Sequence, residues 1–301
     1  MGGWVDAVTG TPDARPVALG LALLAAVAHA VFGALQKGRH DPWLSRGAID
    51  VAYSVMAAPV ALLLVPLPVG AEWAILAGAV AIHLGYKLAQ AMAYSRGDFT
   101  VVYPVVRGTG PLVTVAAAGF VFGEEYRPLQ WLGVLLLSGG ILGLSAVNVR
   151  GVAVGRRRLV AALSWALVTG VFVAAYTTYD AWGIRATPDP FTFLAWFFLL
   201  DGLFFPWIAA ARWLGMANPP ALAALIARGV TGGLVAYVSF GSIMLATRID
   251  KVGQAAVLRE TSVVFAALIG WAFLGERVGA LRAALVVLIA TGAVVMEFGG
   301  G

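Results

Sequence analysis

The chain has 301 residues, of which 61% are hydrophobic and 12% are charged, and its mean hydropathy is +0.89. A soluble globular domain is about 45–50% apolar and about 25% charged, so this composition excludes an ordinary soluble protein. The chain contains no cysteine, which excludes disulfides, thiolate metal sites and cysteine nucleophiles. The pI of about 9.7 does not indicate nucleic-acid binding, because the basic residues are scattered through short loops, where such charges set membrane orientation.

Ten apolar segments follow one another along the chain, each long enough to cross the roughly 30 Å hydrocarbon core of a bilayer as a helix. The first sixteen residues lack the basic stretch and cleavage site of a signal peptide, so none is expected. Because water is excluded from the bilayer core, every segment is predicted to be helical. The short loops between them leave no room for a soluble catalytic domain. The predicted spans are 16–37, 45–67, 72–95, 99–122, 128–148, 159–180, 190–211, 219–247, 252–274 and 279–298.

A basic linker at residues 150–158 separates five predicted spans in residues 1–149 from five in residues 159–301. A shift of 152 residues pairs 93–143 with 245–295 and gives eleven identities in fifty-one positions. Charged residues are harder to share by chance than Leu or Val, and four charged pairs match. An odd number of spans per half gives the second half the opposite orientation, and inverted repeats place a binding site near the midplane. The matching pairs are Arg96/Arg248, Asp98/Asp250, Arg107/Arg259 and Glu124/Glu276.

Two motifs recur in the two halves. The first half contains a segment from Tyr103–Pro104 to Pro111, followed by Gly123–Glu124–Glu125. The second half repeats this pattern with Arg259–Glu260–Thr261, followed by Gly275–Glu276–Arg277. In these motifs the chain resembles the EamA-type domain of the drug/metabolite transporter superfamily over nearly its whole length, and it looks most like bacterial exporters of amino acids, the aromatic ones included. The resemblance implies ten helices around a central cavity, export of small metabolites, and cytoplasmic termini.

The distribution of basic residues favours the opposite orientation. Five basic residues lie at the termini and even-numbered loops, and eleven lie at the odd-numbered loops. Because basic loops stay in the cytoplasm, this count predicts termini outside. The side of the termini therefore stays open.

Polar groups inside a bilayer mark functional positions, because each central charge costs about 2.5–3.5 kcal/mol. In the third span, spacings of three and four place His83, Tyr86 or Lys87, Gln90 and Tyr94 on one helix face. We favour a cavity wall over a helix–helix interface, since an interface rarely needs so many polar groups. Tyr86, near the middle of the span, is the best single candidate for substrate contact.

Arg107 and Arg259 occupy matching positions, each about 10 Å from the start of its helix, and inverted symmetry would put them at opposite depths. Either could bind a substrate carboxylate or act in a gate; the alternatives are snorkelling and a structural ion pair. Glu260 points about 100° away from Arg259 around the helix, so the two need not pair. Pro111, after a Gly-Thr-Gly stretch, predicts either a broken helix that exposes its backbone or a packing kink.

Aromatic and histidine residues complete the candidate site. His29 is somewhat more typical of a hydrogen-bonded packing histidine than of a ligand, and Asp201 is either a proton site or neutralised by a basic neighbour. No firm coupling site emerges, which favours facilitated diffusion or exchange. The expected substrate-binding residues are Tyr86, Gln90, Tyr103, His29, Tyr176 and Arg107, with Arg259, Glu260 and Pro111 as gate or structural residues.

The sequence thus predicts an all-α, multi-pass protein of the cell inner membrane, with ten transmembrane helices as two inverted five-helix repeats around a central cavity. It is expected to be a monomer or weak oligomer that exports small metabolites, amino acids first, by alternating access. Another metabolite or a drug-like solute is the alternative. A channel or an intramembrane enzyme is less favoured, because no ring of repeated polar groups and no nucleophile–base motif is present. The three histidines lack metal-ligand spacing, so no metal or cofactor is expected.

Overall fold

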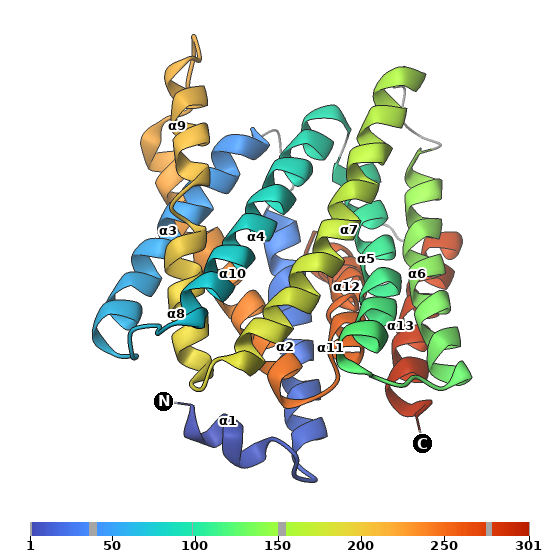
Figure 1. Ribbon diagram of the computed structural model, residues 1–301. Coiled ribbons are helices and arrows are strands. Elements are labelled where there is room, and N and C mark those ends of the chain that lie inside the picture. Colours follow the sequence, from blue (N-terminus) through green and yellow to red (C-terminus); the bar gives the residue numbers. More distant parts are fainter. Residues whose placement is uncertain (1, 36–40, 98, 150–154, 275–278, 301) are drawn as a thin grey trace.

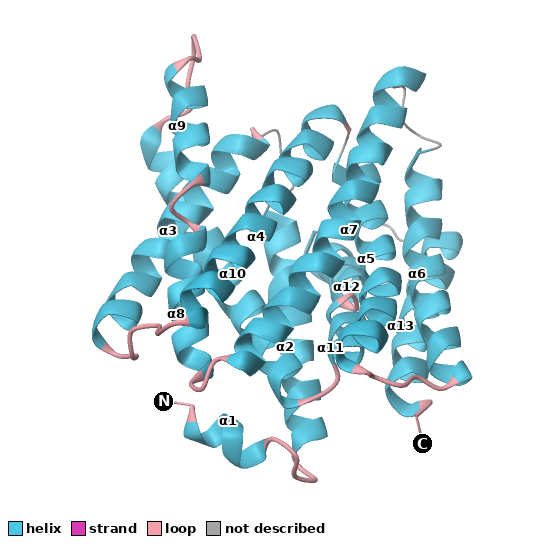
Figure 2. Ribbon diagram, in the orientation of Figure 1, coloured by secondary structure: helices cyan, strands magenta, loops and turns pink. Residues whose placement is uncertain are grey.

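The computed structural model describes residues 2–35, 41–97, 99–149, 155–274 and 279–300, and every regular element in these ranges is a helix (Figures 1 and 2). Ten helical segments within them are long and apolar enough to cross a membrane. The predicted all-α membrane fold with ten spans is therefore confirmed. Residues 150–154 of the basic linker and the Gly275–Glu276–Arg277 motif lie outside the described residues.

Eight spans are single helices, and the seventh and ninth each consist of two helices. The short helix α1, which precedes the first span, is not among the predicted elements. The helices are α1 (Gly3–Val8), α2 (Ala14–Leu35), α3 (Pro42–Leu63), α4 (Ala71–Arg96), α5 (Phe99–Phe122), α6 (Pro128–Val149), α7 (Arg156–Ala186), α8 (Pro190–Asp201), α9 (Phe205–Leu214), α10 (Leu222–Ile249), α11 (Val252–Arg259), α12 (Ser262–Leu274) and α13 (Ala280–Phe298).

The breaks in the seventh and ninth spans lie beside charged residues. α8 ends at Asp201 and α11 ends at Arg259, whereas α5 continues through Pro104 and Pro111. The helix around Pro111 is thus intact rather than broken. A helix end leaves backbone carbonyls without helical partners and favours a nearby cation. Each break therefore brings a charged side chain and a helix end into the membrane interior.

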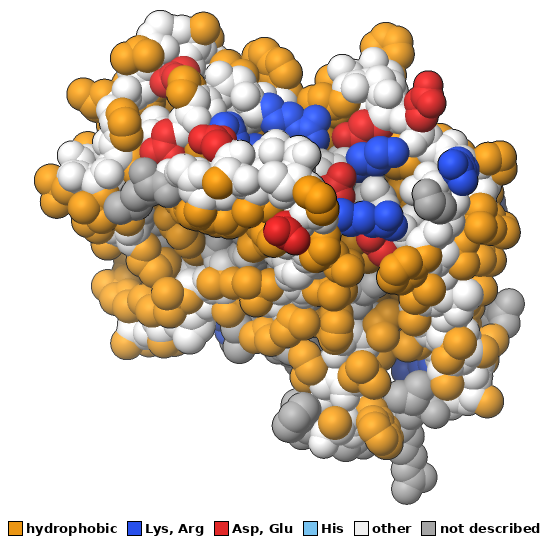
Figure 3. Space-filling view, turned by 90° about the horizontal axis from the view of Figure 1, so that it is seen from below, with side chains coloured by type: hydrophobic (Ala, Val, Ile, Leu, Met, Phe, Trp, Pro, Cys, Tyr) orange, Lys and Arg blue, Asp and Glu red, His pale blue; other side chains and the backbone are white. Residues whose placement is uncertain are grey.

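The surface has apolar flanks and a charged end. Leu63, Phe120 and Trp207 are 79%, 93% and 77% exposed, which is typical of lipid contact. Figure 1 shows both termini at the lower end of the molecule, and Figure 3, which views the molecule from below, shows acidic and basic side chains on that face. Ion pairs at this end join Arg15 to Glu297 at 2.9 Å and Arg248 to Asp6 at 2.8 Å. Termini on one side agree with an even number of spans.

The helices of the two halves pack in corresponding pairs. α4 packs on α7 as α10 packs on α2, and α5 packs on α7 as α11 and α12 pack on α2. α6 and α13, the fifth and tenth spans, pack on each other. This pattern is the one expected of a duplicated chain, and the division at residues 150–158 stays a prediction.

Two glycines let α6 and α13 come into backbone contact. A Cβ atom at Gly133 would lie 2.5 Å from the backbone nitrogen of Met296, and one at Gly292 would lie 2.5 Å from that of Leu137. Atoms of the main chain cannot yield at these points unless the helices separate. Close helix approach at small residues is a common way of packing helices in a bilayer.

We expect Gly133→Ala to lower the melting temperature of the purified protein, since overpacking costs about 1–3 kcal/mol. Gly139→Ala is the matched control, because it changes the same helix at a position with no other atom within 4 Å of the added carbon. The control should melt at the temperature of the unmodified protein or slightly above it, because alanine favours a helix over glycine. Equal melting temperatures for the two variants would contradict the close packing of α6 on α13.

Candidate functional site

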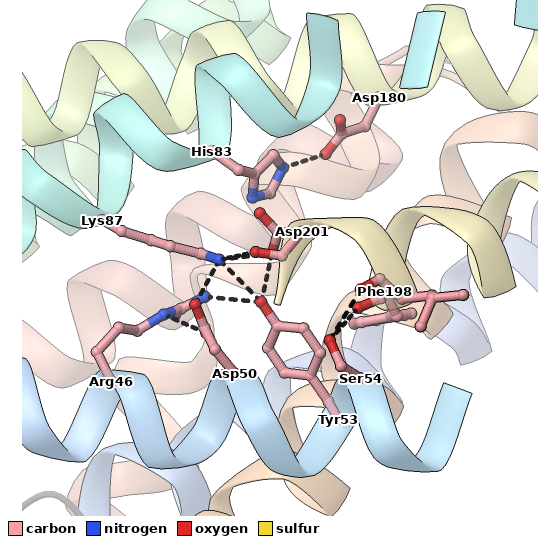
Figure 4. Close-up of polar contacts among 10 residues, drawn as sticks. Arg46, Asp50, Tyr53, Ser54, His83, Lys87, Asp180, Phe198 and Asp201 are labelled. Carbon is pink, nitrogen blue, oxygen red and sulfur yellow. Dashed lines mark hydrogen bonds and ion pairs between the residues drawn. The ribbon is translucent and has the colours of Figure 1, made fainter. Parts of the chain in front are cut away.

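A network of buried charges joins α3, α4 and α8 (Figure 4). We call it the lysine cluster, and its members are Arg46, Asp50, Tyr53, Lys87 and Asp201. Lys87 Nζ lies 2.6 Å from Asp50 Oδ2 and 2.9 Å from Asp201 Oδ2. It also donates to the Tyr53 hydroxyl at 2.9 Å and to the backbone carbonyl of Asp201, the last residue of α8, at 2.7 Å.

The lysine cluster balances its own charge. Arg46 Nε lies 2.8 Å from Asp50 Oδ1, and the Tyr53 hydroxyl donates to Asp201 Oδ2. The side chains of Lys87, Asp50 and Asp201 are at most 3% exposed. Buried charges are costly unless they are paired, and here two cations face two carboxylates. Asp201 is thus neutralised by a basic neighbour, which was one of its two predicted alternatives.

A second buried pair lies next to the lysine cluster. His83 on α4 and Asp180 on α7 are 2.8 Å apart, measured from Nε2 to Oδ2. Figure 4 shows the His83 ring between the carboxylates of Asp180 and Asp201. Among the described residues, Asp180 Oδ1 has no hydrogen-bond partner. The pair therefore adds a third carboxylate to a region whose other charges already balance.

A third group, which we call the arginine cluster, consists of Arg107, Arg259 and Glu260. Arg107 Nη1 donates to Glu260 Oε1 at 2.8 Å, and Arg259 Nε lies 3.4 Å from the same oxygen. All three side chains are at most 4% exposed. Two guanidinium groups and one carboxylate leave an excess of one positive charge in the membrane interior.

The arginine cluster corrects two expectations from the sequence. Arg107 and Arg259 were expected at opposite depths, but their guanidinium groups meet at one carboxylate. Arg259 and Glu260 were not expected to need each other, because neighbours on a helix point about 100° apart. The two side chains nevertheless approach to 3.4 Å, at the point where α11 ends and the break before α12 begins.

Aromatic rings separate the His83–Asp180 pair from the arginine cluster. The Tyr176 ring lies 4.5 Å from the His83 ring and 5.9 Å from Cζ of Arg259. The Tyr86 ring lies 5.0 Å from that of Tyr176, and Gln90 donates to the Tyr86 hydroxyl at 2.6 Å. Tyr176 thus contacts both charged groups.

The remaining predicted residues lie on the α2 and α5 side of the arginine cluster. The rings of His29 and Tyr103 stack with centroids 6.4 Å apart, and Cζ of Arg107 lies 5.4 Å from the Tyr103 ring. Pro111 is buried in α5, one turn beyond Arg107. The structure therefore gathers all six predicted binding residues in the membrane interior, and their roles stay predictions.

Two of the cavities between the helices have charged residues in their walls. One of about 10 Å³ lies between α7, α10 and α11, and Tyr176, Asp180, Phe240 and Arg259 border it. The other, of about 20 Å³, is bordered by Arg46, Lys87, Gln90 and Tyr94 among others. Since one water molecule needs about 10–15 Å³, neither cavity accommodates a metabolite in this conformation.

The prediction from sequence missed three charged residues of this interior. Arg46, Asp50 and Asp180 lie inside apolar spans. Arg46 and Asp50 contact opposite charges on the same or another helix, and Asp180 contacts His83. Their charge within a span was the available signal, because a charge in a bilayer requires a partner. Lys87 was placed on the correct face of the third span, but its carboxylate partners were not identified.

Comparison with known proteins supports a transporter. Residues 160–298 match the sequence model of the EamA-like transporter family. This match covers the second half of the chain, supports the drug/metabolite transporter superfamily, and points to a membrane transporter of small solutes rather than an enzyme. No curated protein matches the chain. A solved structure titled "Crystal structure of protein" is 18% identical, with a TM-score of 0.71, and the alignment covers 95% of this chain and 98% of that one. At this identity the likeness shows a shared fold.

Proposed function

We propose that the protein exports zwitterionic metabolites, above all amino acids with aromatic or hydrophobic side chains, across the cell inner membrane by alternating access. One observation carries the substrate class: Arg259 and Asp180, of opposite charge, border the same buried cavity. An amino acid presents a carboxylate and an ammonium group side by side. Each of these groups needs an opposite charge when it leaves water, and this cavity offers both.

The arginine cluster is suited to the substrate carboxylate. Its excess positive charge lies in a low-dielectric interior, where an anion gains most from a cation, and the planar guanidinium matches a carboxylate. Arg107 belongs to the predicted binding set, and Arg259, predicted as a gate or structural residue, borders the cavity. We propose that both bind the carboxylate and that Glu260 holds them in place.

The aromatic residues are suited to the substrate side chain. Tyr176 and Phe240 border the cavity, and Tyr86 packs edge-on against Tyr176. Aromatic rings bind apolar and aromatic groups through large contact areas and preferred ring geometries. We propose that these three rings form the side-chain pocket, with His29 and Tyr103 on the far side of Arg107.

Alternating access is supported by the candidate site residues, which come from both proposed halves, residues 1–149 and 159–301. α4 and α5 of the first half supply Tyr86 and Arg107, and α7 and α11 of the second supply Tyr176 and Arg259. The cavity itself lies between α7, α10 and α11 of the second half and is too small for an amino acid. Rocking of one half against the other would open this site to each side of the membrane in turn.

Counterflow in proteoliposomes tests this function. Vesicles loaded with unlabelled L-phenylalanine should take up labelled L-phenylalanine transiently and saturably. Phenylpyruvate lacks the ammonium group and phenethylamine lacks the carboxylate, so each would leave one buried charge unpaired. We expect each analogue to compete at least about tenfold less well than L-phenylalanine.

The other outcomes separate the alternatives. Flux that does not saturate would indicate a channel, and formation of a product would indicate an enzyme. Equal competition by all three compounds would refute recognition of the zwitterion. Counterflow of other solutes, with none of any amino acid, would leave an exporter of a different metabolite or of a drug-like compound.

A further inference from the structure

The region around His83 is one positive charge short of neutrality. Its fixed cations are Arg46 and Lys87, and its carboxylates are those of Asp50, Asp180 and Asp201. With His83 neutral, the sum is one negative charge in a buried part of the membrane interior. Asp180 shares a small cavity with Arg259, but no ion pair joins the two among the described residues. A buried charge without a partner is costly, so this region favours the uptake of one proton or one other cation.

Among the three carboxylates, Asp180 is the one left for that cation. Asp50 contacts both Arg46 and Lys87, and Asp201 contacts Lys87 and the Tyr53 hydroxyl. Asp180 contacts His83 alone through Oδ2, and its Oδ1 is without a hydrogen-bond partner in the described part of the chain.

The other charged and titratable groups around the pair lie on α3, α4, α7, α8 and α11. The lysine cluster lies on the α3, α4 and α8 side, and Asp201 and Arg259 both act electrostatically on Asp180. Tyr86 and Tyr176 contact the His83 ring from α4 and α7, and α10 presents the Phe240 ring.

We propose that the His83–Asp180 pair binds a transported proton and that the substrate ammonium group displaces this proton, which makes the protein a proton/amino-acid antiporter. This inference rests on the proposed function. Asp180 borders the same cavity as Arg259, so a zwitterion placed there neutralises the excess negative charge at Asp180 and the excess positive charge of the arginine cluster together. A bound proton neutralises only the excess negative charge at Asp180.

The exchange balances as follows. In the outward step the site carries the substrate, which has no net charge. In the return step the His83–Asp180 pair carries one proton and releases it to the side of the membrane to which the site is then open. No covalent bond other than that to the proton is made or broken. One positive charge crosses the membrane per cycle, so both a pH gradient and a membrane potential drive the exchange.

The unmodified protein gives the first test. Proteoliposomes with an interior one pH unit more acidic than the medium, and with the potential clamped by valinomycin and equal potassium, should accumulate labelled L-phenylalanine about tenfold. The concentration that half-saturates counterflow should also rise as the pH falls, by up to about tenfold per unit, because proton and substrate compete. Two results would overturn the antiport while leaving the proposed function in place. One is accumulation of L-phenylalanine on the alkaline side, and the other is counterflow that depends neither on the pH gradient nor on the pH.

Asp180→Asn gives the second test. The variant leaves two cations facing two carboxylates, so the region is neutral without a proton. We expect counterflow to persist at a raised half-saturating concentration, and gradient-driven accumulation and the pH dependence to be lost. Asp13→Asn, at an exposed position, is the matched control and should retain both.

The outcomes of the two tests are distinct. An Asp180→Asn protein that still accumulates L-phenylalanine about tenfold would overturn the inference. If this variant does not fold, the pH dependence of the unmodified protein decides the question. Absence of counterflow by the unmodified protein with every amino acid tested would refute the proposed function itself.

Discussion

Lys87→Met is expected to lower the free energy of unfolding by about 3–5 kcal/mol, because it removes one partner from buried ion pairs. Asp50 would keep Arg46, whereas the lysine cluster would hold no cation in contact with Asp201. The carbonyl at the end of α8 would lose its donor as well. Methionine nearly matches the length of lysine, so the effect reports charge rather than volume. A fall in melting temperature on the order of 10 °C would be the readout.

A second substitution separates charge imbalance from lost packing. Lys87→Met with Asp201→Asn leaves Arg46 and Asp50 as a balanced pair, so the double variant should melt above either single variant. Lys251→Met is the control, since the Lys251 ammonium group donates to an exposed backbone carbonyl of Glu125 at 2.9 Å, makes no other hydrogen bond among the described residues, and lies over the Tyr126 ring. A Lys87→Met protein that melts like the control would show that the lysine cluster contributes little to stability.

The transmembrane fold could be predicted because one physical quantity, the thickness of the apolar core, fixes the length of each span. The ends of the spans are less constrained. The sixth span was predicted over 159–180, whereas α7 runs over Arg156–Ala186. A helix that tilts or emerges from the lipid continues until its capping residues end it, and hydropathy does not record that point.

The face of α4 could be predicted from its spacing, but its partners could not. Helical periodicity places His83, Lys87 and Gln90 together, and the structure buries all three at least partly. The partners lie far away in sequence: Asp50 is 37 residues from Lys87, and Glu260 is 153 residues from Arg107. Such pairs depend on which helices are neighbours, and a single sequence does not contain that information.

The helix breaks could not be located from the sequence for a related reason. The glycines and prolines before Phe122 left a break or a packing kink in α5 as alternatives, and this helix is continuous. The break after Arg259 contains neither glycine nor proline. Glu260 in this break contacts Arg107 and Arg259, and the Thr261 hydroxyl donates to the Leu258 carbonyl, so tertiary ion pairs and a local hydrogen bond both accompany it.

Arg107→Gln is expected to reduce L-phenylalanine counterflow about 100-fold while the protein stays folded. Arg259 and Glu260 would then balance each other, so the arginine cluster would keep no charge for the substrate carboxylate.

Glu260→Gln is expected to destabilise the protein. It leaves two guanidinium groups without a carboxylate and should cost about 3–5 kcal/mol of the free energy of unfolding.

The double variant Arg107→Gln with Glu260→Gln decides between net charge and a specific contact. It returns one positive charge to the cluster, on Arg259, so counterflow should recover well above that of Arg107→Gln alone. Its melting temperature should exceed that of Glu260→Gln, because one buried cation replaces two. If the double variant transports no better than Arg107→Gln, then the excess charge does not bind the carboxylate. Arg107 would then act through a contact that Arg259 cannot replace.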